Sequence, residues 1–216
     1  VHYTLELNDA YVGLRFDSVF SGIAAQNLKY HIDDVKKVVE NLDGRLVVKY
    51  YPTKSATVNT IKAHLDRVQM MGYKPDMIVV DYADLLRGAG RTQDLRHELG
   101  NIYEDLRGMA GEYQIPVWTA SQANRSSLED DIIGAEKIAE SYSKIMTADF
   151  VLSLSRKIED KIAGTGRWHV IKNRFGPEIY DEGSLQGRNA QKQMDGGEEA
   201  GRKYLQNKFK ELEGNV

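Results

Sequence analysis

The 216-residue sequence contains no cysteine. Disulfide bonds and thiolate zinc sites are therefore excluded, and the absence is typical of a reducing compartment. No run approaches the roughly 20 consecutive apolar residues that a membrane-spanning helix needs, and no signal peptide opens the sequence. These absences predict a cytoplasmic protein with no membrane partner.

A large excess of charge of one sign is also missing. Lysine and arginine total 29 against 32 aspartates and glutamates, which gives a formal net charge of -3. The chain has no overall basic field, so any nucleic-acid surface must be a local stripe. The length predicts one main domain, which we place at residues 1–181, followed by a polar tail at 182–216 with at most one charged helix.

Strand-like and helix-like segments alternate along most of the sequence. The expected strands are VHYTLEL, RLVVKYY, DMIVVDY and IPVWTASQ, followed by the closely spaced ADFVLSLSR, RWHVIKNRF and EIYD. Four helices are expected. The first is capped by Asn8 and Asp9 and runs to about Phe20, and the second is DDVKKVVENL. The third begins at Ser55 and ends at Gly72, and the fourth and longest runs from Gln93 to Tyr113. This order predicts an α/β fold, with a mainly parallel twisted sheet flanked by helices and antiparallel strands at the C-terminal end.

A polar residue follows each of three expected strands: Glu6, Asp81 and Gln122. Ligands of parallel sheets bind outside the carboxyl ends of the strands. A single acid there is most often a helix cap or a solvated turn residue, but three polar residues together indicate a site. One carboxylate can hold Mg²⁺ through water, a second can polarise an attacking water, and an amide can hydrogen-bond a terminal phosphate.

Four segments carry a family resemblance: PDMIVVDYADLL, IPVWTASQANRS, AESYSKIMTADFVLSLSR and VIKNRFGP. In this order and at these separations they resemble the RecA-like motor domain of DnaB-type replicative helicases, and their amino-acid sequence is closest to that of the T-even phage branch. The resemblance covers residues 1 to about 181. It implies ATP-driven translocation and unwinding of DNA at a replication fork by a homo-hexameric ring, with ATP and Mg²⁺ as cofactors. Primase and a helicase loader are candidate partners, in a bacterial cell or a phage-infected host.

The resemblance also implies roles for single residues. Glu6 matches the catalytic glutamate, Asp81 the Walker B magnesium carboxylate and Gln122 the phosphate-sensing glutamine. Lys172 and Arg174 match a piston-like pair that reaches across a subunit interface to the neighbour's terminal phosphate. Two cations two residues apart on a strand share a face, and the planar fork of arginine can grip phosphoryl oxygens. The alternative is a solvated basic strand edge.

One element of the family is missing. The phosphate-binding loop G-x-x-x-x-G-K-S/T does not occur; the segment RGAGRTQ at residues 87–93 has glycines but no lysine followed by serine or threonine. In the family this loop lies upstream of the strand that carries the glutamate. We therefore expect the sequence to begin just after the loop, neither to bind nor to hydrolyse ATP alone, and to be monomeric or loosely associated.

Single-stranded DNA is the expected macromolecular ligand. The loops after Asp81 and after Gln122 should face the central channel of a ring, and mobile cations there suit a motor that ignores base sequence. The alternative is that these are ordinary surface residues. The candidate contacts are Arg87, Arg91, Arg96, Asn124 and Arg125.

The aromatic and imidazole side chains indicate no further site. Trp118 and Trp168 lie within expected strands, so we expect them in the core rather than stacked on bases. The five histidines are scattered without the spacing of metal ligands.

Two other functions fit part of the pattern. A RecA-like strand-exchange recombinase shares the fold and the carboxylates but forms open filaments, and the segments KNRFGP and SQANRS favour the helicase over it. A RecA-like assembly domain that does not turn over nucleotide would explain the missing loop. Retention of both carboxylates, Gln122 and the Lys172–Arg174 pair is evidence against that third function.

Overall fold

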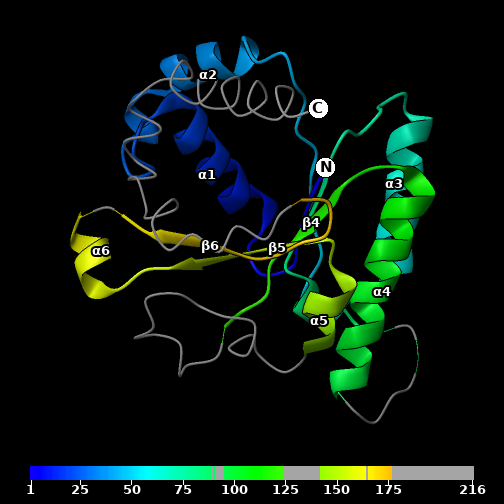
Figure 1. The fold of residues 1–216 in the computed structure, drawn as a ribbon. Helices are drawn as coiled ribbons and strands as arrows, with labels where there is room; N and C mark the ends of the chain where they lie inside the picture. Colours follow the sequence, from blue (N-terminus) through cyan, green and yellow to red (C-terminus); the bar gives the residue numbers. More distant parts are fainter. Residues whose placement is uncertain (89, 91–94, 124–141, 164, 177–216) are drawn as a thin grey trace, which may run out of the picture. The chain divides into compact units, whose positions relative to one another are not determined.

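The computed structural model describes residues 1–88, 90, 95–123, 142–163 and 165–176 (Figure 1). The chain divides into two compact units, Val1–Ser121 and Gln122–Val216. Each unit is considered separately below. None of the helices in the described ranges is long and apolar enough to cross a membrane.

The first unit is built on a four-stranded parallel sheet. Its strands are β1 (His2–Thr4), β2 (Val48–Tyr50), β3 (Ile78–Asp81) and β4 (Val117–Thr119), in the order β2-β1-β3-β4. Every pairing is parallel, and His2 of β1 lies between Val48 and Val79 of its two neighbours. The expected mainly parallel sheet is thus confirmed for this unit.

Helices cover both faces of this sheet. The helices of this unit are α1 (Asp9–Ser21), η1 (Leu28–Tyr30), α2 (Ile32–Glu40), α3 (Val58–Met70), η2 (Ala83–Leu85) and α4 (Leu95–Tyr113). Figure 1 shows α3 and α4 on one side of the strands and α1 on the other. Alternation along β1 agrees, because the ring of His2 contacts Phe16 of α1 whereas the ring of Tyr3 contacts His64 of α3.

The core lies between the sheet and the α3–α4 layer. Side chains spaced by threes and fours on these helices pack on the alternate, inward residues of the strands. The fully buried members with large side chains are Tyr3, Leu5, Ile61, Leu65, Ile78, Val80, Leu86, Leu99, Ile102 and Met109. The apolar face of α3 and of α4 is therefore the face that packs on the sheet.

The helix caps agree with the sequence at α1 but not at α3. The Asn8 side chain accepts a hydrogen bond from the backbone N–H of Tyr11 at 3.0 Å, as expected. Ser55 does not open α3, because its hydroxyl donates to the Pro52 carbonyl instead. The cap is Thr57, which exchanges hydrogen bonds with Thr60 in a reciprocal capping box.

The second unit contains an antiparallel hairpin. Helix α5 (Tyr142–Thr147) precedes β5 (Phe150–Ser155), α6 (Ile158–Ala163) and β6 (Arg167–Asn173). Strands β5 and β6 pair in a separate two-stranded sheet. The expected antiparallel strands are confirmed, although α6 stands where a simple turn was expected. The predicted strand EIYD and the predicted tail at 182–216 lie outside the described residues.

The two tryptophans do not lie in the core. Trp118 in β4 is 49% exposed and Trp168 in β6 is 39% exposed, so that prediction was wrong. Trp118 pairs with Val79 on the α1 face of the sheet, away from the buried α3–α4 layer. Trp168 belongs to a two-stranded sheet, which cannot cover both of its own faces.

Candidate active site

Two of the predicted acids lie at one edge of the parallel sheet. Asp81 is the last residue of β3, and Thr4, the last residue of β1, is its partner in the neighbouring strand. Glu6 follows Thr4 by two residues, so both acids leave the sheet at its carboxyl edge. This is where ligands of open parallel sheets bind.

The turn that carries Glu6 is fixed by its neighbours. The N–H of the buried Leu5 donates to the Asp81 carbonyl at 2.9 Å, and the Leu5 carbonyl accepts from the Thr53 hydroxyl at 2.9 Å. The Thr4 hydroxyl donates to the Leu7 carbonyl at 2.5 Å. The backbone on both sides of Glu6 is therefore held, while the Glu6 side chain is exposed.

The Asp81 carboxylate has a neutral neighbour. Its Oδ2 lies 4.0 Å from Nε2 of His2, and the Asp81 side chain is 38% exposed. Burial lowers the pKa of His2 below its ordinary value of 6.5, although the charge of Asp81 opposes that shift. At neutral pH His2 therefore leaves the negative charge of Asp81 uncompensated. The peptide bond between Asp81 and Tyr82 is cis.

Asp81 suits a hydrated magnesium ion. Mg²⁺ keeps several waters and takes one or two protein carboxylates, so a single accessible acid at a strand end fits it. Across the described ranges no group of three or more histidines, aspartates or glutamates could hold a metal ion in a closed cage. The donor set at this edge thus favours a water-bridged ion over a structural metal site.

A cluster that the sequence did not reveal lies beside Asp81. Asp84 accepts hydrogen bonds from the Tyr103 hydroxyl at 3.0 Å and from the Ser121 hydroxyl at 3.0 Å, one on each carboxylate oxygen. Burial and the Asp84 charge raise the pKa of Tyr103, so its hydroxyl stays protonated and remains a donor. The only sequence signal was an acid three residues after Asp81.

The Asp84 cluster joins three elements. Asp84 lies in η2, Tyr103 in α4 and Ser121 just after β4. The Thr119 hydroxyl strengthens the junction, since it accepts from the Ala83 N–H at 2.9 Å and donates to the Val80 carbonyl at 2.8 Å. The turn after Asp81 is therefore tied to the end of β4, immediately before Gln122.

The segment after Asp84 is held from both sides. Lys54 Nζ donates to the carbonyls of Asp84 and Leu86 at 3.1 and 2.8 Å. The Arg87 N–H donates to the Ala56 carbonyl at 2.9 Å, and the Gly88 N–H donates to Glu98 Oε1 at 2.7 Å. The loop expected to contact DNA thus starts from a fixed base at the same edge of the sheet.

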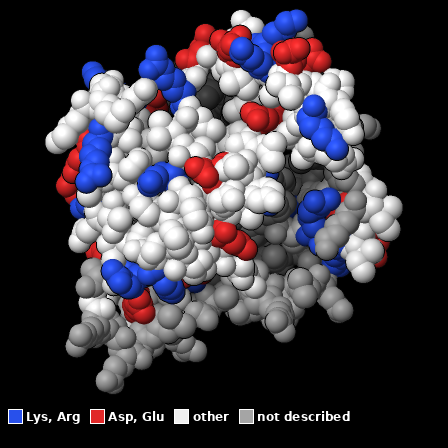
Figure 2. Space-filling model, turned by 180° about the vertical axis from the view of Figure 1, so that it is seen from behind, with Lys and Arg blue, Asp and Glu red and all other residues white. Residues whose placement is uncertain are grey.

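Of the predicted DNA contacts, only Arg87 has a described side chain, and it is exposed. Arg91, Asn124 and Arg125, and the side chain of Arg96, lie outside the described part of the chain. On the described residues that Figure 2 shows, lysines and arginines are interspersed with aspartates and glutamates.

Gln122, Lys172 and Arg174 belong to the second unit. Gln122 is exposed. Lys172 Nζ donates to the carbonyls of Ile145 and Met146, both at 2.8 Å, and Arg174 Nη2 donates to the same Met146 carbonyl at 3.3 Å. Because both side chains donate to the Met146 carbonyl, the two cations share a face, as expected from their spacing.

A bulge lies next to this pair of cations. Lys172 pairs with Val151 whereas Val170 pairs with Leu152, which leaves Ile171 as an extra residue in β6. Bulges bend a strand, increase its twist and turn side chains in a new direction. The bulge therefore sets the direction of Lys172 separately from the rest of β6.

Comparisons with known proteins identify relatives of this chain. The family model described as "DnaB-like helicase C terminal domain" matches residues 2–182. The DnaB-like replicative helicase of Enterobacteria phage T4 is 31% identical over 137 residues, which cover 62% of this chain and 29% of that protein. The replicative DNA helicase DnaB of Geobacillus stearothermophilus is 30% identical over 162 residues, which cover 71% of this chain and 36% of that protein.

Two solved structures share the fold. One is that of a DnaB-like replicative helicase described with its interactions with primase, with a TM-score of 0.69, 19% identity, and coverage of 82% of this chain and 46% of that chain. The other is described as an ATPase domain, with a TM-score of 0.66, 18% identity, and coverage of 82% of this chain and 67% of that chain. The fold is thus RecA-like, and the chain spans less than half the length of the two helicase relatives above.

Proposed function

Because this chain belongs to the DnaB-like helicase C-terminal domain family, we propose that it is part of the ATP-driven motor of a ring-shaped replicative helicase. The ring is a homo-hexamer that moves on single-stranded DNA and unwinds the duplex at a replication fork. It works in the cytoplasm of a bacterial or phage-infected cell, with primase and a helicase loader as partners. The observation that carries the proposal is the placement of Asp81 and Glu6 at one carboxyl edge, on backbone fixed by hydrogen bonds.

Each residue of the proposed site has its own chemical role. Asp81 holds Mg²⁺ through water, and Glu6 orients and polarises the attacking water. Gln122 hydrogen-bonds the terminal phosphate, since its amide offers both a donor and an acceptor. Lys172 and Arg174 act on nucleotide held by the neighbouring subunit, where their charge offsets that of the phosphoryl group in the transition state.

The described residues fit one half of an ATP site. Magnesium-bound ATP supplies the phosphoryl group, and Asp81 and Glu6 suit its hydrolysis. The other half, a glycine-rich loop with its lysine, does not occur in these 216 residues. Two acids without that loop would repel a triphosphate, so functional tests require the complete reading frame that encodes this chain.

The proposal is tested by substituting the two acids in that complete protein. Glu6→Gln should lower ATP hydrolysis by about 100-fold or more, because a positioned general base contributes on that scale. Asp81→Asn should abolish magnesium-dependent hydrolysis, and DNA unwinding should be lost in both variants. Circular dichroism and thermal unfolding should match the parent, since both side chains leave the sheet toward solvent.

The matched control is Glu40→Gln, which neutralises an exposed acid of α2 whose partner is Lys36, at 3.8 Å on the same helix. Hydrolysis and unwinding should stay at the parental rates in this variant. Parental hydrolysis in Glu6→Gln or Asp81→Asn would show that the site is assigned to the wrong residues.

A further inference from the structure

The open end of the β5–β6 hairpin is closed by one pair of residues. Asp149 immediately precedes β5, and Arg174 immediately follows β6. The Arg174 N–H donates to the Asp149 carbonyl at 2.9 Å, and Arg174 Nη1 lies 2.9 Å from Asp149 Oδ1. Asp149 therefore fixes both the backbone and the guanidinium of Arg174.

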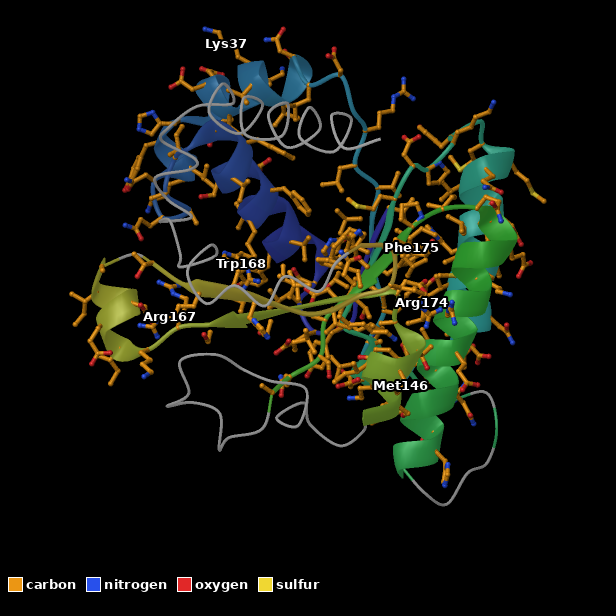
Figure 3. All side chains as sticks on the ribbon, viewed as in Figure 1. Lys37, Met146, Arg167, Trp168, Arg174 and Phe175 are labelled. Carbon is orange, nitrogen blue, oxygen red and sulfur yellow. The ribbon has the colours of Figure 1, made fainter. Side chains whose placement is uncertain are left out.

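The last turn of α5 completes this arrangement. The Met146 carbonyl accepts from both Arg174 and Lys172, and the Ile145 carbonyl accepts from Lys172. Figure 3 shows Arg174 at the end of the hairpin near Met146 of α5. We call Asp149 and the carbonyls of residues 145 and 146 the cradle; it holds both cations through three acceptors.

The cradle orients the cations without cancelling their charge. Lys172 and Arg174 carry two positive charges and Asp149 one negative charge, while the carbonyls carry none, so the cluster stays net positive. Within the described residues the Arg174 guanidinium contacts only Asp149 and Met146, through its two Nη atoms, and its side chain is 36% exposed. The rest of the fork remains accessible to phosphoryl oxygens.

We propose that Asp149 is a positioning residue for Arg174: with the two carbonyls it holds the guanidinium and the Lys172 ammonium as a preformed pair, aimed at phosphate of the adjoining subunit. This inference rests on the proposed function. A fork that is already oriented loses little rotational freedom when it engages the transition state, which is the benefit of preorganised groups. In this role Asp149 acts through Arg174 and needs no contact of its own with the nucleotide.

The same hairpin provides a matched control. At its other end Asp160 of α6 lies 3.1 Å from Nη1 of Arg167, the first residue of β6. Asp149→Asn and Asp160→Asn therefore make the same chemical change, in the same unit, to two aspartate–arginine pairs. Only the first pair includes a residue of the proposed reaction.

The first test measures orientation without nucleotide. In this chain, nuclear magnetic resonance of the arginine side chains should show separate Nη signals for Arg174, because the contacts with Asp149 and Met146 slow rotation of the guanidinium. Asp149→Asn should merge those signals, and Asp160→Asn should leave them unchanged. Merged Arg174 signals in the parent chain would overturn the inference directly.

The second test measures turnover in the complete protein. Asp149→Asn should lower kcat for DNA-stimulated ATP hydrolysis by about 10-fold, with KM within about two-fold of the parent, because misplaced reacting groups reduce the rate rather than substrate binding. Asp149→Glu, which keeps the charge, should restore most of kcat, and Asp160→Asn should match the parent. If Asp149→Asn does not fold, the test uses Asp149→Glu alone, whose loss of kcat relative to the parent should be smaller than about 10-fold.

Arg174→Ala distinguishes an error in the positioning role of Asp149 from an error in the proposed function. If Arg174→Ala abolishes turnover but Asp149→Asn hydrolyses ATP at the parental rate, the positioning role is wrong and the proposed function stands. A rise in kcat for Asp149→Asn would also overturn the inference, since the pair would then restrain Arg174. Parental turnover in Arg174→Ala itself would overturn the role proposed for Arg174, and the positioning role with it.

Discussion

Tyr103→Phe tests whether the Asp84 cluster fixes the turn after Asp81. The substitution removes one hydroxyl and keeps the ring, which is only 8% exposed, so it opens no cavity. It deletes the 3.0 Å hydrogen bond to Asp84 Oδ1 and a longer contact of 3.4 Å to the Ala120 carbonyl. The loss therefore measures what the hydroxyl contributes to the junction of η2, α4 and β4.

The expected cost follows from the type of hydrogen bond. A hydrogen bond to a charged group contributes about 1.5–3 kcal/mol. The Ser121 hydroxyl still donates to the other oxygen of Asp84, and Asp84 is half-buried, so water can replace part of the lost contact. We therefore expect the free energy of unfolding to fall by about 1–2 kcal/mol, in the lower part of that range.

The assay is urea denaturation of this chain followed by tryptophan fluorescence. A Trp168→Phe background leaves Trp118 of β4 as the reporter of the first unit. The urea midpoint should fall while the slope m is unchanged, since the surface exposed on unfolding stays the same. The control is Tyr11→Phe, the same change on a ring that is 61% exposed, which should alter stability by less than about 0.5 kcal/mol.

Equal midpoints for Tyr103→Phe and Tyr11→Phe would refute the reasoning. They would mean that the Tyr103 hydroxyl gains no more from Asp84 than from water. A fall in the slope m would also count against it, because the substitution would then have changed the denatured ensemble or the cooperativity of unfolding.

Two other predictions concern pH and salt. Burial lowers the pKa of His64 below 6.5, so His64 takes up a proton less readily in the folded than in the unfolded chain, and the unfolding free energy should fall as pH drops below about 6.5 and level off above it. In urea titrations between pH 7.5 and 5.5, His64→Phe should reduce this pH dependence of the unfolding free energy, and equal pH dependence in the parent and His64→Phe would contradict the assignment. In the complete protein, Arg87→Ala should reduce the slope of log affinity for single-stranded DNA against log salt concentration by about 0.7, the value of one lost phosphate contact. Arg45→Ala, which removes an exposed cation that stacks on Tyr73, should leave this slope unchanged. An unaltered slope for Arg87→Ala would show that the DNA surface lies elsewhere.

The sequence predicted the parallel strands and the edge where Asp81 and Glu6 lie because both depend on local pattern. Ile78 and Val80 are fully buried in β3, and the acid that follows them is half-exposed. An apolar strand that ends in a carboxylate thus marks the end of burial. The positions of strand ends in a parallel sheet then bring the two acids to one edge without any knowledge of tertiary contacts.

Tertiary contacts account for what the sequence did not predict. Ser55 and Thr57 are both suitable caps, and the choice depends on Pro52 and Thr60, which occupy the two hydroxyls. The residues that bind Asp84 are 19 and 37 positions away in the chain, and no local pattern connects them. The same holds for Asp149 and Arg174, which meet only because β5 and β6 pair. The exposure of Trp118 depends on which face of the sheet the helices cover.

An aspartate–arginine ion pair lies near each end of the β5–β6 hairpin. The hairpin is therefore a stiff element that can transmit force along its strands. A push or pull on Arg174 along the strand axis loads the hydrogen bonds between the strands together, in shear, because these bonds run perpendicular to the strands. The displacement therefore reaches Ser155 and Arg167 at the far end instead of peeling the strands apart one bond at a time. The hairpin bends most easily at the extra residue Ile171, because the regular ladder of hydrogen bonds between the strands is interrupted there.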